Sequence, residues 1–404
     1  MENFDIIIIG AGPAGTCCAS LLKDKGHSCL ILEKSDFPRF TIGESFLPQN
    51  MVFYKEAGLL DVFCENSYQL KNGAQFLKKN SLSDIDFSQK FTQGPATTFQ
   101  VPRDDFDHKI AQKVQQKGVE IYFNTEVKKI TFTSSDYPVS VSALDCEANE
   151  KSYRSKFIID ASGQAKVLPK LLEMNIEYSA QNRSSYFTHI KTRTPAKFDL
   201  NKILISVDDE NEKCWFWTIP LNDNRYSLGV ITDEKDGGLT PTETLYSYIN
   251  RNKKLKDLIG DFDLEIEVRK IQSYTSKSET KFGEHFLLIG NSGEFLDPIF
   301  SSGVTIALKS SSLAAPLINQ HLQGKFIDWQ SDYLDKLNKG LESFRAFVDS
   351  WYSGELQTII LAKKVTPQIK EMIISILAGY VWDDKNPYNT KSSKRLKALA
   401  QVCE

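Results

Sequence analysis

The N-terminal segment constrains the fold more than any other part of the chain. The motif DIIIIGAGPAG is an apolar strand that runs directly into a loop with Gly10, Gly12 and Gly15. A helical stretch follows and ends near Gly26, and a second apolar strand ends at Glu33. The order strand, glycine loop, helix, strand and acid predicts a βαβ unit that binds a dinucleotide.

Each part of this unit has a physical reason. Gly10 permits a tight turn, and Gly12 lets the backbone approach a pyrophosphate group. Gly15 lets the helix pack closely on the strand, so its N-terminal amides and dipole face the phosphates. Glu33 is placed to accept hydrogen bonds from a ribose diol. The alternative is a glycine turn without a ligand, and the strand, helix and acid together argue against it.

Bulk composition narrows the class of protein. With 404 residues the chain is long enough for two or three domains. A net charge of -3 argues against a nucleic-acid partner. The seven cysteines form no C-x-x-C pair, so neither a zinc site nor a disulfide framework is expected. The longest apolar tract, residues 372–382, is shorter than the roughly 20 residues of a membrane span. No signal peptide is recognised, so we predict a cytoplasmic protein without a membrane span.

Three later segments identify the dinucleotide. Residues 100–127 carry an arginine, a helix and a strand, residues 157–163 form a strand ending in small residues, and residues 285–308 form a strand, loop and helix. This set and order resemble the FAD monooxygenases of the p-hydroxybenzoate hydroxylase type. The resemblance implies an α/β fold: a Rossmann-like FAD-binding domain, a β-sheet substrate domain and a helical C-terminal region.

The resemblance also implies how FAD is held. Asp297 and Pro298 would lie beside the flavin, and a helix opened by Gly303 would point at its ring. Arg103 would reach the pyrophosphate region, and the Val127 backbone would meet the adenine. The residues expected to contact FAD are Gly10, Gly12, Pro13, Ala14, Gly15, Glu33, Lys34, Arg39, Gly43, Glu44, Ser45, Arg103, Val127, Ala161, Ser162, Gly163, Asn291, Asp297, Pro298, Ser302, Gly303 and Val304. For Glu44 and Ser45 the alternative is that they only hold their loop.

A second resemblance rests on CWFWTIP, where Trp215 and Trp217 form a W-x-W-x-I-P signature. Residues 37–50 (FPRFTIGESFLPQN), 297–304 (DPIFSSGV) and 70–76 (LKNGAQF) agree with it. Together they resemble the flavin-dependent halogenases. Aspartate before the proline and the K-x-G-A-x-F context are nearer the phenol and pyrrole branch than the tryptophan branch. In that branch the acceptor is often tethered to a carrier protein.

The halogenase resemblance implies roles for four catalytic residues, Lys71, Trp215, Trp217 and Asp297. In such enzymes reduced FAD and oxygen oxidise a halide to hypohalous acid, which travels to a distant aromatic acceptor. Strand alternation puts both tryptophans on one face, where they would keep the acceptor off the flavin. Lys71 would hydrogen-bond hypohalous acid or form a haloamine, and desolvation would lower its pKa. The alternative is a surface lysine.

The halide itself would bind the backbone amides of Ser302 and Gly303, at the start of a helix. The alternative is that Ser301 and Ser302 only cap that helix. No second G-x-G-x-x-G motif is found in the sequence. Reduced flavin is therefore expected from a separate reductase, unless nicotinamide binds transiently.

The sequence is compatible with two other functions. An FAD monooxygenase or a geranylgeranyl-reductase-like dehydrogenase would keep the scaffold without halogenation. A non-catalytic flavin-binding protein would use the C-terminal helices as a partner surface. Halide incorporation and its dependence on Lys71 separate the halogenase from both.

The domain division follows from the placement of the motifs. We predict an FAD-binding domain from residues 1–70, 100–170 and 280–325. Residues 71–99 and 171–279 would form the substrate domain, and residues 326–404 the helical C-terminal region. Two residues depart from the flavoprotein pattern: Asn291 replaces a common aspartate, and Glu294 adds a charge for which the sequence gives no reason.

Overall fold

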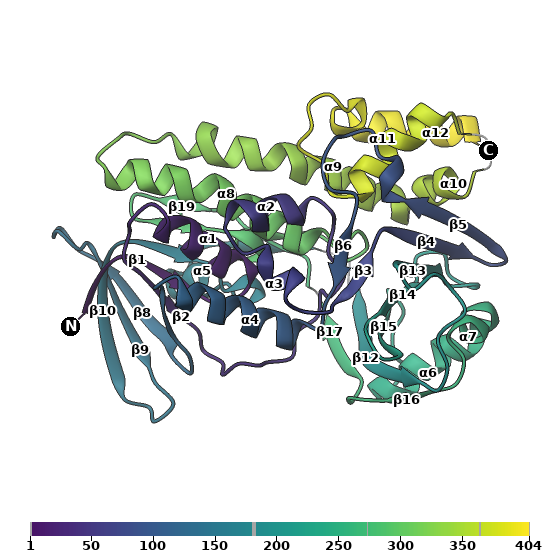
Figure 1. Cartoon of the computed structure of the whole chain (residues 1–404), viewed down its shortest axis with the longest axis horizontal. Coiled ribbons are helices and arrows are strands. Elements are labelled where there is room, and N and C mark those ends of the chain that lie inside the picture. The colour runs from purple at the N-terminus through teal and green to yellow at the C-terminus, as the bar shows by residue number, and fades with distance from the viewer. Residues whose placement is uncertain (1, 180–182, 273, 363–364, 404) are drawn as a thin grey trace.

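The computed structural model describes residues 2–179, 183–272, 274–362 and 365–403. Two large sheets lie side by side, and helices cover them (Figure 1). The last helices of the chain, yellow in Figure 1, gather at the upper right, above one of the two sheets. This mixed arrangement confirms the predicted α/β fold class.

The first sheet is built around the N-terminal strand β1 (Glu2–Ile9). Its parallel neighbours are β2 (Cys29–Leu32) and β10 (Glu150–Asp160), and β7 (Glu120–Tyr122) and β20 (Phe286–Leu288) extend the sheet on either side. The isoleucines of β1 are buried on both faces, as expected of a central parallel strand.

Different elements cover the two faces of this sheet. Ile6 and Ile8 belong to the core cluster that contains residues of helices α1 (Pro13–Lys23), α4 (Arg103–Gln116) and α8 (Ser302–Leu322). Ile7 and Ile9 pack instead with the antiparallel hairpin of β8 (Glu126–Phe132) and β9 (Val139–Leu144). The glycine loop lies at the carboxyl end of β1, between that strand and the start of α1.

The second sheet has the order β16-β12-β15-β14-β13-β4-β5, with β17 also paired to β12. Its bounds are β4 Gly73–Lys78, β5 Ser81–Asp86, β12 Ser184–Thr192, β13 Lys202–Val207, β14 Trp215–Pro220, β15 Arg225–Thr232, β16 Phe262–Leu264 and β17 Arg269–Gln272. Helices α6 (Pro241–Arg251) and α7 (Lys253–Ile259) pack on one face.

Strand β14 shows why the alternation of its side chains matters. It forms an antiparallel hairpin with β15. Trp215 and Trp217 join the core shared with the first sheet, while Phe216 joins the separate core under α6 and α7. The prediction that both tryptophans share one face is confirmed, and that face is the one turned toward the first sheet.

The C-terminal helices close the space between the sheets. They are α9 (Asp335–Tyr352), α10 (Glu355–Leu361), α11 (Pro367–Leu377) and α12 (Ser392–Cys403). Ser83 on β5 donates a hydrogen bond to the Ile360 carbonyl of α10. Helix α10 therefore lies against β5, and the end of α9 comes close to β14, where Trp215 donates a hydrogen bond to Tyr352.

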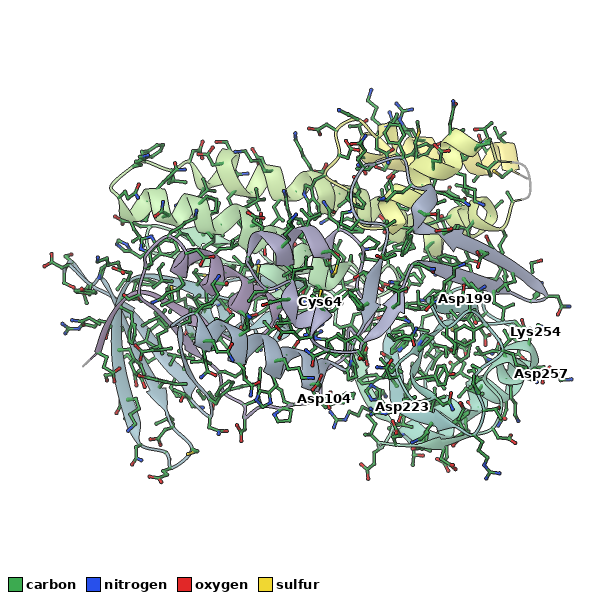
Figure 2. All side chains as sticks on the ribbon, viewed as in Figure 1. Cys64, Asp104, Asp199, Asp223, Lys254 and Asp257 are labelled. Carbon is green, nitrogen blue, oxygen red and sulfur yellow. The ribbon has the colours of Figure 1, made fainter. Side chains whose placement is uncertain are left out.

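Outer surfaces carry charges of both signs. Figure 2 shows Lys254 and Asp257 at the right-hand edge of the molecule, and both belong to the short helix α7. No helix within the described ranges is both long and apolar enough to cross a membrane. In the same part of the chain, no group of three histidine, cysteine or acidic side chains is arranged to hold a metal.

Candidate active site

The glycine loop leaves no room for side chains where it turns. Gly10 has a φ of +99°, and a Cβ there would lie 2.8 Å from the Ala161 carbonyl oxygen. A Cβ on Gly15 would lie 2.0 Å from the Gly10 carbonyl oxygen. Gly12 differs, because the only close atom is Arg39 Nη2 at 3.9 Å. Protein atoms therefore pack closely against the loop at Gly10 and Gly15, whereas the loop is accessible at Gly12. That accessibility fits the approach of a pyrophosphate.

Glu33 is held at the end of β2 by two backbone amides. The Ala11 and Ser35 N–H groups donate to its two carboxylate oxygens, at 2.9 and 3.0 Å. Arg39 lies 3.9 Å from the same carboxylate and 3.6 Å from Asp107. The acid therefore has a fixed orientation beside the glycine loop, as a ribose-binding residue requires. Lys34, next in sequence, is exposed.

Arg103 is the first residue of α4 rather than part of the preceding loop. Its buried guanidinium makes a two-pronged pair with Asp107 at 2.8 and 2.9 Å, and it also donates to the Ile42 and Gly43 carbonyls. Arg103 therefore holds the turn that precedes Glu44 and Ser45.

Glu44 links the two sheets. Its buried carboxylate accepts a hydrogen bond from the Gly43 N–H and lies 3.0 Å from His189 Nε2 on β12. Phe40 packs edge-on against the same imidazole. Ser45 is paired through the backbone with Gln100 on β6 (Thr98–Gln100). This loop thus reaches from the FAD-binding side to the second sheet.

Asn291 has a buried orphan oxygen. It lies in the short 3₁₀ turn Gly290–Ser292 after β20, and its Oδ1 has no hydrogen-bond partner among the described residues. That oxygen lies 3.9 Å from where a Cβ on Gly303 would stand. Buried polar atoms are almost always satisfied, so an acceptor left open here fits a donor group of a bound cofactor.

Helix α8 begins beside this oxygen, at Ser302. Ser301 precedes it with a φ of +53° and makes no side-chain capping bond. The alternative that Ser301 caps the helix through its hydroxyl is therefore wrong. The first amides of α8 remain the predicted halide-binding groups.

Remaining predicted cofactor residues lie along the same edge. Ala161 and Ser162 follow β10, and the Ser162 N–H donates to Asp160, whose pKa is raised by burial. Val127 is buried on β8, opposite Ala143.

Glu294, unexplained by the sequence, pairs with Lys281 at 2.9 Å and with Arg345 from α9. Its charge is structural and ties the region after β20 to the C-terminal helices.

The tryptophan face is joined to Asp297 by a chain of hydrogen bonds. Trp215 Nε1 donates to the Tyr352 hydroxyl at 2.9 Å, and that hydroxyl donates to Asp297 at 3.1 Å. Arg183 also binds Asp297, at 3.2 Å, and its guanidinium lies 3.3 Å above the Tyr352 ring. Burial nevertheless raises the pKa of Asp297 to about 6, because desolvation outweighs the attraction of Arg183.

Trp217 is fixed differently from Trp215. Its Nε1 donates to Ser227 at 3.1 Å, and its ring covers Gly229, where a Cβ would lie 2.3 Å from the indole. The two indoles are 6.0 Å apart. Both are almost fully buried, so they form a rigid wall rather than a mobile flap.

Lys71, the lysine to which the halogenase resemblance assigns a role, is buried. It ends β3 (Gln69–Lys71), is 1% exposed, and donates to the Phe46 carbonyl at 2.8 Å. No carboxylate pairs with it in the described part of the chain. Burial alone lowers its pKa from 10.5 to about 7. The alternative of a surface lysine is wrong, and the desolvation that the functional hypothesis needs is present.

Three residues of this site were not predicted from the sequence. Tyr352 and Arg183 meet at Asp297, and His189 meets Glu44. None belongs to a recognisable motif, since each reaches the site from a distant element. The apolar periodicity of α9 was the only signal, and it indicates a packed helix rather than a functional tyrosine.

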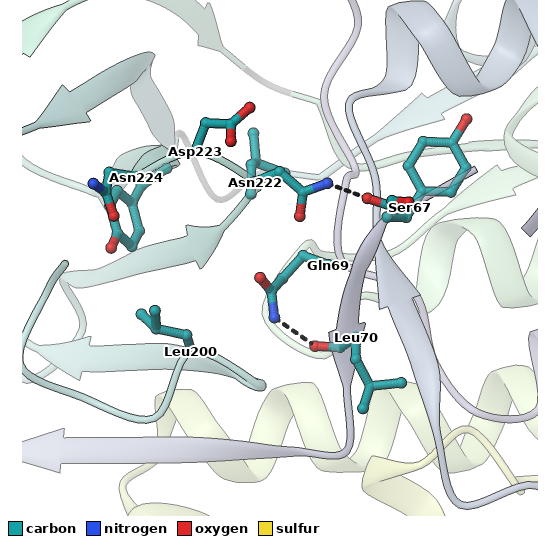
Figure 3. Close-up of a pocket in the computed structure, with 10 residues that line it drawn as sticks. Ser67, Gln69, Leu70, Leu200, Asn222, Asp223 and Asn224 are labelled. Atoms are coloured by element: carbon teal, nitrogen blue, oxygen red, sulfur yellow. Dashed lines mark hydrogen bonds between the residues drawn. The ribbon is translucent and has the colours of Figure 1, made fainter.

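A surface cleft opens beside β3 (Figure 3). Its volume is about 610 Å³, and it lies between residues 67–70 and the turn at residues 221–224. Gln69 borders it and donates to the Leu70 carbonyl, and also to Asn201 at 3.1 Å. The cleft and Lys71 thus share one short strand.

With this geometry established, comparison with known proteins defines the class. A family model described as an FAD binding domain matches residues 3–325. The chain therefore belongs to this FAD-binding family, and it is an FAD-dependent oxidoreductase.

Similar proteins indicate which branch of the flavin-dependent enzymes this chain is nearest. A 1H-pyrrole-2-carbonyl-[peptidyl-carrier protein] brominase of Pseudoalteromonas luteoviolacea is 29% identical, over 95% of this chain and 93% of the relative. A corresponding chlorinase of Pseudomonas fluorescens is 25% identical, over 100% of this chain and 93% of the relative. These findings confirm the resemblance to flavin-dependent halogenases, nearer the pyrrole and phenol branch.

Solved structures agree on the fold. A flavoprotein/dehydrogenase from Cytophaga hutchinsonii is 37% identical, with a TM-score of 0.94 over 100% of this chain and 99% of that one. A triple mutant of a flavin-dependent brominase is 26% identical, with a TM-score of 0.83 over 99% of both chains.

Proposed function

We propose that this protein halogenates an electron-rich aromatic acceptor of the pyrrole or phenol type, held on a carrier protein. The observation that carries the proposal is Lys71, a buried amine with no carboxylate partner among the described residues. Both carbonyl-carrier halogenases that resemble this chain act on a tethered pyrrole, which supports the acceptor class.

Reduced FAD, when bound, supplies the electrons with which oxygen converts a halide and a proton into hypohalous acid and water. In this proposal, residues 1–70, 100–170 and 280–325 form the FAD-binding domain. Gly12, Glu33 and Asn291 would hold the cofactor, and the amides of Ser302 and Gly303 would hold the halide. A separate reductase supplies the reduced flavin, and the protein acts in the cytoplasm.

The two tryptophans and Lys71 then have separate roles. Trp215 and Trp217 keep the acceptor ring away from the flavin, because their indoles are buried and hydrogen-bonded in place. Lys71 holds the oxidised halogen and directs it at the ring. Electrophilic substitution then exchanges a ring hydrogen for the halogen and releases water.

Mass spectrometry of products tests this function. Purified protein is supplied with FAD, a flavin reductase, oxygen and bromide or chloride, with pyrrole-2-carbonyl and phenol acceptors, free and carrier-bound. The expected product carries the halogen isotope pattern. An oxygen adduct without halogen would assign a monooxygenase instead.

A dehydrogenase is the second candidate, and the 37% identity to a flavoprotein/dehydrogenase favours testing it. The same preparation is mixed with NADPH without a reductase. Rapid direct oxidation of NADPH, with no halogenated product, would support the dehydrogenase.

A further inference from the structure

Four polar side chains occupy one face of a small strand pair. Strands β3 and β6 pair antiparallel, with Gln69 opposite Gln100 and Lys71 opposite Thr98. Side chains that face each other across an antiparallel pair lie on the same side, and residues two apart on one strand share that side. The face therefore carries two glutamines, the lysine and the threonine.

Two members of this face are buried with hydrogen-bonding capacity left unused, while Gln69 is half-buried and borders the surface cleft. Thr98 and Gln100 are both 0% exposed. Thr98 Oγ1 and Gln100 Nε2 have no hydrogen-bond partner in the ranges that the structure describes. Leaving such groups unsatisfied destabilises a fold by about 1–3 kcal/mol each, so a ligand or a water is expected to bind them.

Lys71 crosses this face. Residues 44–46 run along the other edge of β6, where the Phe46 N–H donates to the Phe99 carbonyl and Ser45 pairs with Gln100. The Lys71 amine reaches the Phe46 carbonyl on that far side. Its side chain must therefore pass over β6, on the face that carries Thr98. The amine therefore lies on the same face of the strand pair as the two orphan groups.

We propose that Thr98 and Gln100, together with Lys71, bind the hypohalous acid that the enzyme makes. The inference rests on the proposed function and assigns two further binding residues to it. Hypohalous acid is small, neutral and carries one O–H donor and an oxygen acceptor. A hydroxyl that both donates and accepts, an amide N–H and an amine match those groups. Complete burial excludes water that would otherwise dilute the oxidant.

The face also connects the predicted flavin side to the lysine. Ser45 Oγ lies 3.5 Å from Gln100 Oε1, and Gln100 is followed on the same face by Thr98. An oxidant released near Ser45 meets Gln100 first and Thr98 with Lys71 next. Thr98 thus binds the oxidant where the amine can take it over.

The test measures how much of the hypohalous acid reaches the acceptor and how much escapes into solution. Thr98→Val keeps the shape and removes the hydroxyl, and Gln100→Met removes the amide. In each variant, halogenated product per reduced flavin consumed is expected to fall about tenfold, the value of one lost hydrogen bond. Hypohalite captured by an added β-diketone trap is expected to rise by the matching amount, while flavin oxidation is unchanged. Thr98→Ser retains the hydroxyl and is expected to behave as the parent.

Thr218→Val is the matched control. Thr218 is also a buried strand threonine with an orphan hydroxyl, but alternation puts it on the Phe216 face of β14, away from the tryptophan wall. Its product ratio is expected to equal that of the parent. Melting curves and FAD titrations of all variants separate misfolding from altered partition.

Three outcomes would overturn the inference. An unchanged ratio in both Thr98→Val and Gln100→Met means that water satisfies these groups. Loss of product with no extra trapped hypohalite, together with weaker acceptor binding by calorimetry, means that the face binds the acceptor. If the parent itself yields neither hypohalite nor halogenated product, the proposed function fails, and this result is distinct from the first two.

Discussion

Two buried lysines of this protein differ in whether a carboxylate lies beside the amine. Lys281 is 5% exposed and is paired with Glu294, which Arg345 also binds. Lys71 is 1% exposed, donates to the Phe46 carbonyl and lies 5.7 Å from the centre of the Phe87 ring, and no carboxylate pairs with it in the described part of the chain. Burial lowers the pKa of both, but the carboxylate beside Lys281 opposes that shift, while nothing opposes it at Lys71.

The difference shows how structural and functional burial of charge are distinguished. A paired charge joins elements, as Glu294 joins the strand after the 3₁₀ turn to helix α9. A buried amine without a carboxylate partner weakens the fold, and such perturbed groups concentrate at functional sites. The orphan groups of Thr98 and Gln100 beside Lys71 fit the same rule.

The largest expected effect comes from Lys71→Arg. Arginine keeps a cation but cannot lose its proton, so it can neither form a haloamine nor act as a neutral amine. Halogenation is expected to fall about 100- to 1,000-fold. Steady-state assays of halogenated product would show this, with FAD affinity unchanged. Near-parental turnover would mean that only a positive charge is needed.

At the paired lysine the expected effect is on stability instead. Glu294→Gln leaves Lys281 buried without its counter-charge, which is expected to lower the free energy of unfolding by about 3 kcal/mol. Denaturant titration measures this change. Glu284→Gln, at a side chain 84% exposed, is the control and is expected to leave stability unaltered. Equal curves for the two variants would contradict the structural role.

The unpaired lysine also predicts a pH dependence of stability. Because the folded pKa of Lys71 is about 7 and its ordinary value is 10.5, the unfolded chain binds more protons between these values. The penalty for burying Lys71 is full below pH 7 and fades as pH rises toward 10. Lys71→Met is thus expected to be more stable than the parent at pH 6, by up to about 5 kcal/mol. Thermal melts should show this gap closing by pH 10; a constant gap would contradict the shifted pKa.

A smaller effect is expected at the tryptophan wall. Tyr352→Phe removes the hydroxyl that joins Trp215 to Asp297. Halogenated product per reduced flavin is expected to fall about threefold to tenfold, because the indole loses one fixed partner. Tyr246→Phe on α6 is the control, since that ring stacks on Phe262 outside the wall. Unchanged coupling in Tyr352→Phe would show that packing alone holds the wall.

The parts of the site that the sequence predicted are local in the chain. The glycine loop and Glu33 lie within one βαβ unit, and the shared face of Trp215 and Trp217 follows from strand alternation. The parts that it missed depend on distant contacts. Tyr352 meets Trp215 across 137 positions, and His189 meets Glu44 across 145. No local pattern specifies such meetings, because tertiary packing creates them.

Lys71 lies between these cases. Its sequence context predicted a role, but the absence of a carboxylate partner and the orphan groups beside it depend on the pairing of β3 with β6. The charge of Glu294 was likewise inexplicable until Lys281 and Arg345 were placed around it.

The most direct test compares Lys71→Met with Lys281→Met in one assay of halogenated product per reduced flavin consumed, normalised to folded, FAD-loaded protein. We expect Lys71→Met to lose halogenated product while flavin oxidation continues, and Lys281→Met to keep the parental ratio despite lower stability. Retained halogenation in Lys71→Met, or an equal loss in both variants, would contradict the claim that the unpaired lysine is the reactive one.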